Sequence, residues 1–198
     1  MRLSLQLDRR PIVVALAGPN GAGKSTFYHA HLGRTGLRFV NADVLALSLE
    51  MDAYAAANKA DALRRKLVEL RESFIFETVF SDPVGDKLTF LKECEKAGYT
   101  ALLIFIGISA PEISDERVAM RVAQGGHDVP ANKIVERYPR VMSNLKRAFA
   151  ELSNMRVYDN DDLKTPYRLV AGKDNRQKIE LHEPTPQWLR VLLPPELS

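Results

Sequence analysis

The chain has 198 residues, of which 45% are hydrophobic and 27% are charged, an ordinary balance for a globular protein with a buried core. Its 28 basic and 25 acidic side chains give a net charge of +3, which is too small an excess to indicate a nucleic-acid partner. Because no stretch reaches the roughly 18 apolar residues of a membrane span and Cys94 is the single cysteine, we expect a cytoplasmic protein without membrane association.

The first half of the chain alternates predicted strands and helices. An apolar run at 11–17 predicts a strand buried on both faces, and a helix is expected to begin at Lys24. The next predicted elements are strands at 37–40, 73–78 and 99–108 and helices at 44–71 and 84–97. The last of these strands is the most hydrophobic segment, so we expect it near the centre of the sheet.

The second half begins with a helix expected from Ser114 and continues with a long amphipathic helix at 132–152. Short strands are then predicted at 155–158, 167–171 and 178–181. This order predicts one α/β domain over residues 1–198, a three-layer sandwich around a mostly parallel sheet, with a helical lid segment at about 111–131 and C-terminal strands at about 155–182.

A glycine-rich segment joins the first predicted strand to the first predicted helix. It reads GPNGAGKS at 18–25 and matches the phosphate-loop pattern G-x-x-x-x-G-K-[ST] in its expected context. Its glycines permit backbone N–H groups to converge on phosphate oxygens, while Lys24 is expected to bridge the outer phosphates and Ser25 to ligand Mg²⁺. The predicted nucleotide-binding residues are Gly18, Pro19, Asn20, Gly21, Ala22, Gly23, Lys24, Ser25 and Thr26.

Two other short patterns are typical of GTPases, D-x-x-G at 82–85 and N-K-x-D at 58–61. Their order along the chain is the reverse of that in switch GTPases, and the second lies within a predicted helix, so we interpret both as chance matches. The remaining plan is that of a small-molecule kinase, which binds its acceptor beyond the carboxyl ends of neighbouring strands.

Acidic residues follow two predicted strands at the place where such an acceptor would bind. Asp43 can take a proton from a substrate hydroxyl, although an aspartate there can also cap the following helix. Glu77, followed by Thr78, ends an apolar strand, where a carboxylate requires a ligand, a metal-bound water or a basic neighbour. A purely structural Glu77 stays an alternative.

Two pairs of arginines flank a hinge-like segment at 124–130. Arg117 and Arg121 share one predicted helix, and Arg137 and Arg140 share the next. Arginines on a mobile segment can neutralise the charge that builds on a transferred phosphoryl group, and the alternative is a solvated basic face.

Several segments together resemble the zeta toxin family, the P-loop kinases of toxin–antitoxin systems. The resemblance covers roughly residues 13–160 and rests on GPNGAGKST at 18–26, FVNAD at 39–43, FET at 76–78, RVAQGGHDVP at 121–130, RY at 137–138 and VYDN at 157–160. It implies a nucleotide-kinase-like fold and an ATP- and Mg²⁺-dependent phosphotransferase. The acceptor it implies is a hydroxyl of a small molecule such as UDP-N-acetylglucosamine, and it also implies an antitoxin protein as a partner.

The same resemblance implies roles for individual residues. Asp43 would be the catalytic base, Glu77 and Thr78 would face the acceptor, and Arg121 and Arg137 would clamp the phosphates. Two other functions stay open from the residues alone. One is an ATP-binding switch without a small acceptor, and the other is a polynucleotide end kinase, against which the modest net charge argues.

Overall fold

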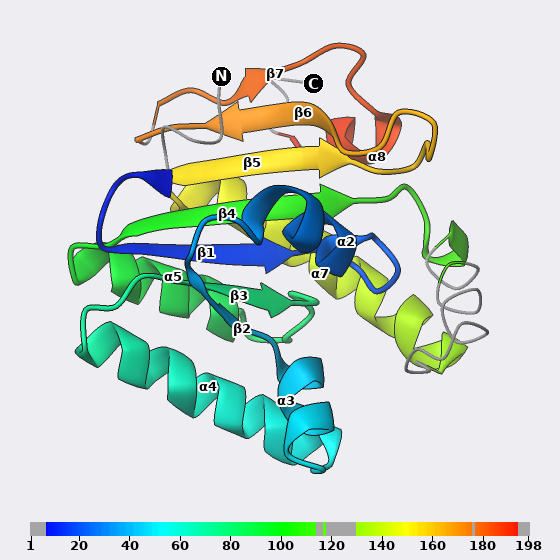
Figure 1. The fold of residues 1–198 in the computed structure, drawn as a ribbon. Helices are drawn as coiled ribbons and strands as arrows, with labels where there is room; N and C mark the ends of the chain where they lie inside the picture. Colours follow the sequence, from blue (N-terminus) through cyan, green and yellow to red (C-terminus); the bar gives the residue numbers. More distant parts are fainter. Residues whose placement is uncertain (1–6, 114–116, 118–129, 176, 194–198) are drawn as a thin grey trace.

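The computed structural model describes residues 7–113, 117, 130–175 and 177–193 (Figure 1). Its elements in chain order are β1 (Ile12–Ala17), α2 (Lys24–Phe27), a π-helix (Tyr28–Leu32), β2 (Arg38–Val40), α3 (Ala42–Ser48), α4 (Ala53–Glu69), β3 (Phe74–Thr78), α5 (Asp86–Lys96), β4 (Thr100–Gly107), α7 (Ala131–Glu151), β5 (Asn154–Asp159), β6 (Arg168–Lys173), β7 (Glu180–Leu181) and α8 (Gln187–Arg190). Most of the predicted lid segment, including Arg121, lies outside the described residues.

Seven strands form one sheet in the order β2-β3-β1-β4-β5-β6-β7. The first five strands in this order, from β2 through β1 to β5, run parallel to one another. Strand β6 is antiparallel to β5, and β7 is antiparallel to β6. The predicted strand at 99–108 is β4, which occupies the middle of the sheet as expected. The mostly parallel α/β fold predicted from the sequence is therefore confirmed.

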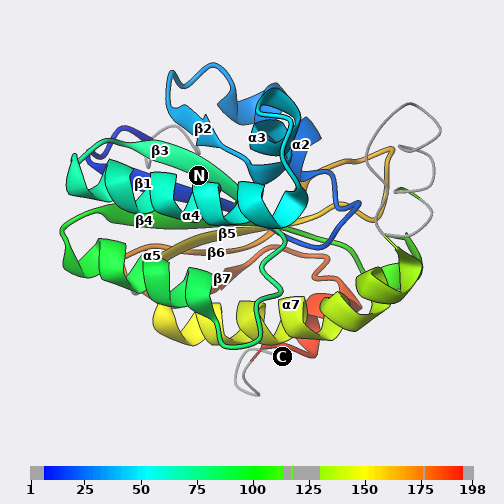
Figure 2. The same ribbon diagram turned by 90° about the horizontal axis from the view of Figure 1, so that it is seen from below.

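Side chains alternate between the two faces of the sheet and build a core on each side. Val13 and Ala15 of β1 belong to one cluster, which includes side chains of α4, α5, α7 and α8. Val14 and Leu16 belong to the other, which includes Phe27 at the end of α2. Figure 2 shows α5 and α7 on one side of the sheet and α2 on the opposite side, which gives the three layers.

The predicted helix at 44–71 is wrong in one respect, because the structure divides it into α3 and α4. Glu50 adopts a left-handed backbone conformation with φ of 50°, which ends the first helical segment. Asp52 then begins the second, since its carboxylate accepts hydrogen bonds from the N–H groups of Tyr54 and Ala55 at 2.9 and 3.0 Å. Among the described helices, none is long and apolar enough to cross a membrane.

Candidate active site

The phosphate loop lies between β1 and α2, at the carboxyl edge of the parallel strands. Gly18 has φ of 143°, and a Cβ atom at this position would lie 2.1 Å from the carbonyl oxygen of Ile106. Only glycine fits so close to a neighbouring backbone. Lys24 is 7% exposed, and its ammonium donates hydrogen bonds to the carbonyl oxygens of Gly18 and Pro19 at 3.0 and 2.9 Å. The lysine is therefore held directly over the loop.

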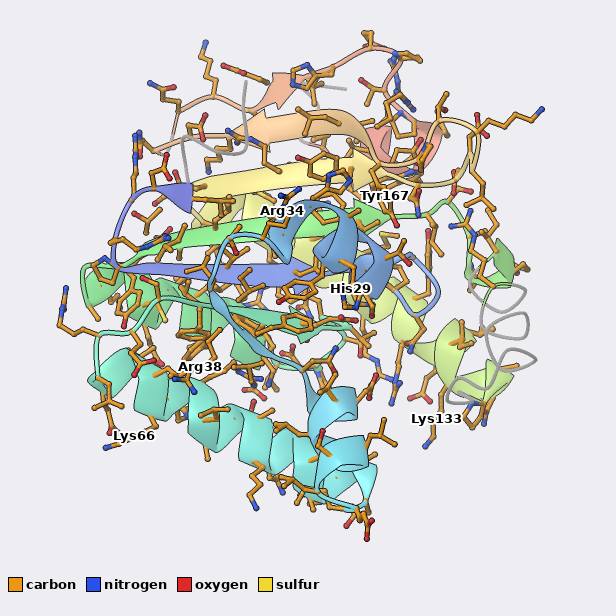
Figure 3. The ribbon with its side chains drawn as sticks, viewed as in Figure 1. His29, Arg34, Arg38, Lys66, Lys133 and Tyr167 are labelled. Atoms are coloured by element: carbon orange, nitrogen blue, oxygen red, sulfur yellow. The ribbon has the colours of Figure 1, made fainter. Side chains whose placement is uncertain are left out.

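Two residues after β5 brace this loop, and neither was predicted from the sequence to have a role. Asn160 donates a hydrogen bond from Nδ2 to the carbonyl oxygen of Ala22 at 2.8 Å. Tyr167, labelled in Figure 3, donates one from its hydroxyl to the carbonyl oxygen of Gly23 at 3.0 Å. Asn160 also accepts the N–H of Tyr167 at 3.2 Å, which ties the two braces together. Asn160 belongs to the VYDN segment of the family resemblance, which was the only available signal.

Glu77 lies beside the phosphate loop because β3 pairs with β1 in a register that sets Thr78 opposite Ala17. Its carboxylate accepts hydrogen bonds from Ser25 Oγ at 3.0 Å and from Asn41 Nδ2 at 2.9 Å. The ammonium of Lys24 lies 4.0 Å from Glu77 Oε1, although it bonds more closely to the loop carbonyls. The half-buried carboxylate thus has two hydrogen-bond donors and a basic neighbour.

The Ser25 hydroxyl and the Glu77 carboxylate also have the chemistry of a Mg²⁺ site. Both supply hard oxygen atoms, and these lie 3.0 Å apart beside the loop that would hold the phosphates. Mg²⁺ usually takes one or two protein oxygens and completes its shell with water and substrate phosphates. Within the described part of the chain there is no cluster of three acidic, histidine or cysteine side chains that would bind a metal by itself.

Asn41 joins Glu77 to the start of α3. Its side-chain oxygen accepts hydrogen bonds from the N–H groups of Asp43 at 2.8 Å and Val44 at 3.2 Å, so Asn41 is the N-cap of this helix. Asp43 does not cap the helix, which was the structural alternative for this residue. The sequence carried a signal for this, since asparagine is a favoured N-cap and precedes Asp43 by two positions.

A pocket of about 370 Å³ adjoins the phosphate loop and collects five of the predicted site residues. Lys24, Asp43, Glu77, Thr78 and Arg137 all line it, and they come from α2, α3, β3 and α7. We call it the acceptor pocket. A second hollow of about 400 Å³ lies near Thr100, at the amino end of β4, and contains none of the predicted residues. Because the acceptor must lie next to the bound phosphates, the pocket beside the phosphate loop is the better candidate for the acceptor site.

The remaining predicted residues differ in how they are held. Thr78 uses its hydroxyl oxygen to accept the N–H of Phe80 at 3.1 Å, which supports the turn after β3. Arg137 is partly exposed and lines the pocket, whereas Arg140 forms an ion pair with Glu136 at 2.8 Å on the same helix. Arg121, the other predicted phosphate clamp, lies outside the described residues.

A phosphate loop between β1 and α2, next to a pocket at the carboxyl edge of a mostly parallel sheet, defines a P-loop phosphotransferase. Residues 50–169 match the Zeta toxin family, and the chain belongs to this family. As a member it is an ATP-dependent kinase. No curated protein sequence matches the chain significantly.

Several solved structures share this fold. The complex AvrRxo1-ORF1:AvrRxo1-ORF2 with sulphate ions is 20% identical with a TM-score of 0.73, and the alignment covers 99% of this chain and 68% of that one. The same complex with ATP is 19% identical with a TM-score of 0.69, and the alignment covers 91% of this chain and 64% of that one. The PezAT chromosomal toxin–antitoxin system of Streptococcus pneumoniae is 19% identical with a TM-score of 0.60, and the alignment covers 82% of this chain and 72% of that one. These identities establish the fold alone, and this chain spans about two thirds of the length of those proteins.

Proposed function

We propose that the protein transfers the γ-phosphate of ATP, in the presence of Mg²⁺, to a hydroxyl of a small molecule bound in the acceptor pocket. A nucleotide sugar such as UDP-N-acetylglucosamine is the first acceptor to test. The observation that carries the proposal is that one pocket is lined both by Lys24 of the phosphate loop and by Asp43. The carboxylate of Asp43 is exposed and does not cap α3, since Asn41 has that role. Phosphate donor and hydroxyl acceptor can therefore meet there.

In this proposal the loop N–H groups and Lys24 bind the phosphates, and Ser25 and Glu77 would hold Mg²⁺. The bound cation would neutralise charge on the β- and γ-phosphates. Asp43 accepts the proton of the acceptor hydroxyl as its oxygen bonds to the γ-phosphorus, and ADP leaves. Arg137, together with Arg121, neutralises charge on the transferred group. The protein contributes mainly by positioning the reactants, because phosphoryl transfer needs little covalent help.

The test compares the wild type with Asp43→Asn, using labelled ATP and a metabolite extract. We expect a new phosphorylated small molecule with the wild type, and turnover lower by about a hundredfold or more in Asp43→Asn, because a general base is lost. The affinity for ATP should not change. Glu50→Gln is the control, since Glu50 is an exposed acid between α3 and α4 that does not line the pocket.

The outcomes separate the alternatives. Equal turnover in Asp43→Asn would remove this residue from the mechanism. Production of only ADP and free phosphate would favour an ATP-binding switch. Salt-sensitive binding of oligonucleotides, with transfer to their ends, would favour a polynucleotide end kinase.

We also propose an antitoxin protein as a partner. Support comes from the family and from the similarity to the PezAT toxin–antitoxin system. Induced expression in a bacterial host should slow growth with the wild type and not with Asp43→Asn. Equal growth of both strains at equal protein levels would argue against a toxic activity.

A further inference from the structure

A buried arginine forms part of the wall of the acceptor pocket. Arg64 of α4 is 5% exposed, and its guanidinium carbon lies 4.9 Å from the ring centre of Phe76 and 6.0 Å from that of Phe90. Burial lowers the pKa of Arg64 to about 10, so the side chain stays charged at neutral pH. A charge is seldom buried without a compensating partner, and the partners of this arginine are therefore informative.

The described residues balance the charge of Arg64 but do not supply acceptors for all of its N–H donors. Asp61, one turn earlier on α4, forms an ion pair with Arg64, and it is also 3.2 Å from the ammonium of Lys87. Two cations thus share one carboxylate. A guanidinium has five N–H donors in a planar fork, and Asp61 is the acceptor that the described residues supply. The described residues supply no further acceptor for this fork, and Arg64 lines both the acceptor pocket and an adjoining hollow of about 210 Å³.

Two further acids face this cluster, Asp86 in the first turn of α5 and Asp82 in the turn after β3. Both lie close enough to Lys87 to raise the pKa of that lysine, against the larger lowering by burial and by Arg64. Both carboxylate oxygens of Asp82 are buried, and no described residue donates a hydrogen bond to either. Asp82 therefore offsets the positive charge at a distance without occupying the donors of Arg64 or Lys87.

We infer that Arg64, assisted by Lys87, binds an oxyanion of the phosphoryl acceptor. This inference rests on the proposed function, because Asp43 lines the same pocket and would receive the acceptor's hydroxyl. The fork of a guanidinium matches the two oxygens of a phosphate or carboxylate, which a lysine ammonium does not. The substrate class is thus a hydroxyl-bearing small molecule that also carries a phosphate or a carboxylate.

The test measures binding of matched probes by calorimetry, with saturating Mg²⁺ and ADP so that the phosphate loop is filled. One pair is N-acetylglucosamine 1-phosphate and N-acetylglucosamine, and the other is gluconate and sorbitol. The wild type should bind the charged member of one pair at least about tenfold more tightly than its neutral twin, the effect of one or two charged hydrogen bonds. The pair that shows the preference identifies the anion as phosphate or carboxylate.

Three variants sharpen the result. Arg64→Lys keeps the charge but loses the fork, and it should lose most of the preference. Lys66→Gln is the matched control, since Lys66 is an exposed cation on the same helix, pairs with Glu69 and lines neither the acceptor pocket nor the adjoining hollow. Asp61→Asn should change the affinity in the opposite direction, because it removes a competing carboxylate and frees donors for the probe. Loss of folding could not produce this tighter binding.

Equal binding of charged and neutral twins by the wild type, or an unchanged preference in Arg64→Lys, would overturn the inference. Failure of the proposed function gives a different pattern. In that case anion binding would depend on Arg64, while labelled ATP would yield no phosphorylated product in the metabolite assay.

Discussion

Replacement of Asn41 by alanine should destabilise the protein more than the loss of an ordinary helix cap. The Asn41 side chain is 7% exposed and makes three hydrogen bonds, two that cap α3 and one from Nδ2 to Glu77 at 2.9 Å. Loss of a cap costs about 1 kcal/mol. A hydrogen bond to a charged group contributes about 1.5–3 kcal/mol. We therefore expect the free energy of unfolding to fall by about 2.5–4 kcal/mol in Asn41→Ala.

The structure offers a matched control in the next helix. Asp52 caps α4 through the same pair of hydrogen bonds, at 2.9 and 3.0 Å, and its side chain is exposed with no contact to Glu77 in the described structure. Asp52→Ala should lower the free energy of unfolding by about 1 kcal/mol. Urea unfolding followed by circular dichroism measures both variants, and the difference between them isolates the contact with Glu77.

Equal losses in Asn41→Ala and Asp52→Ala would refute this reasoning, because they would show that the contact with Glu77 adds nothing to the cap. A double-mutant cycle with Glu77→Gln gives an independent check. If Asn41 and Glu77 interact, Glu77→Gln should change the stability less in the Asn41→Ala background than in the wild type.

Three further predictions concern the loop and the core. Gly18→Ala should abolish nucleotide binding measured by calorimetry, since its Cβ would lie 2.1 Å from the Ile106 carbonyl oxygen; wild-type affinity would contradict the close approach. Tyr167→Phe removes the hydrogen bond to Gly23 and should lower the free energy of unfolding by about 1 kcal/mol in urea; an unchanged value would dismiss the brace. Burial raises the pKa of Cys94 to about 12, so a thiol reagent at pH 8 should label it only after unfolding; rapid labelling of the folded protein would disprove its burial.

The parts of the site that follow directly from local patterns could be predicted from the sequence. The phosphate loop is a continuous segment, and its glycines, lysine and hydroxyl each have a physical reason to be there. The convergence of Asp43 and Glu77 follows from topology, because parallel neighbouring strands end at the same edge of a sheet. In the structure Val40 of β2 pairs with Phe76 of β3, which brings Asn41 beside Glu77.

The features that were missed depend on contacts between distant segments, or on a helix break that the local sequence pattern does not mark. Asn160 reaches the loop across 138 positions, and the VYDN segment around it does not indicate which part of the chain it contacts. Arg64 lies in an alanine-rich helix where an arginine is ordinarily solvated, and its burial depends on how α4 meets Phe76 and Phe90. The break before Asp52 contains no glycine or proline, so the helical pattern concealed it.

Glu77 connects the two halves of the proposed reaction. Its carboxylate binds Ser25 on the nucleotide side and Asn41 on the acceptor side, and Asn41 fixes the first turn of the helix that carries Asp43. In the proposed mechanism, Ser25 and Glu77 would hold Mg²⁺ together, and Glu77 also accepts the hydrogen bond of Asn41. The position of the base relative to the γ-phosphate would then depend on one carboxylate. The proposed mechanism would account for a charged residue at the end of an apolar strand, because a neutral residue there would hold neither the cation nor the amide of Asn41 as strongly.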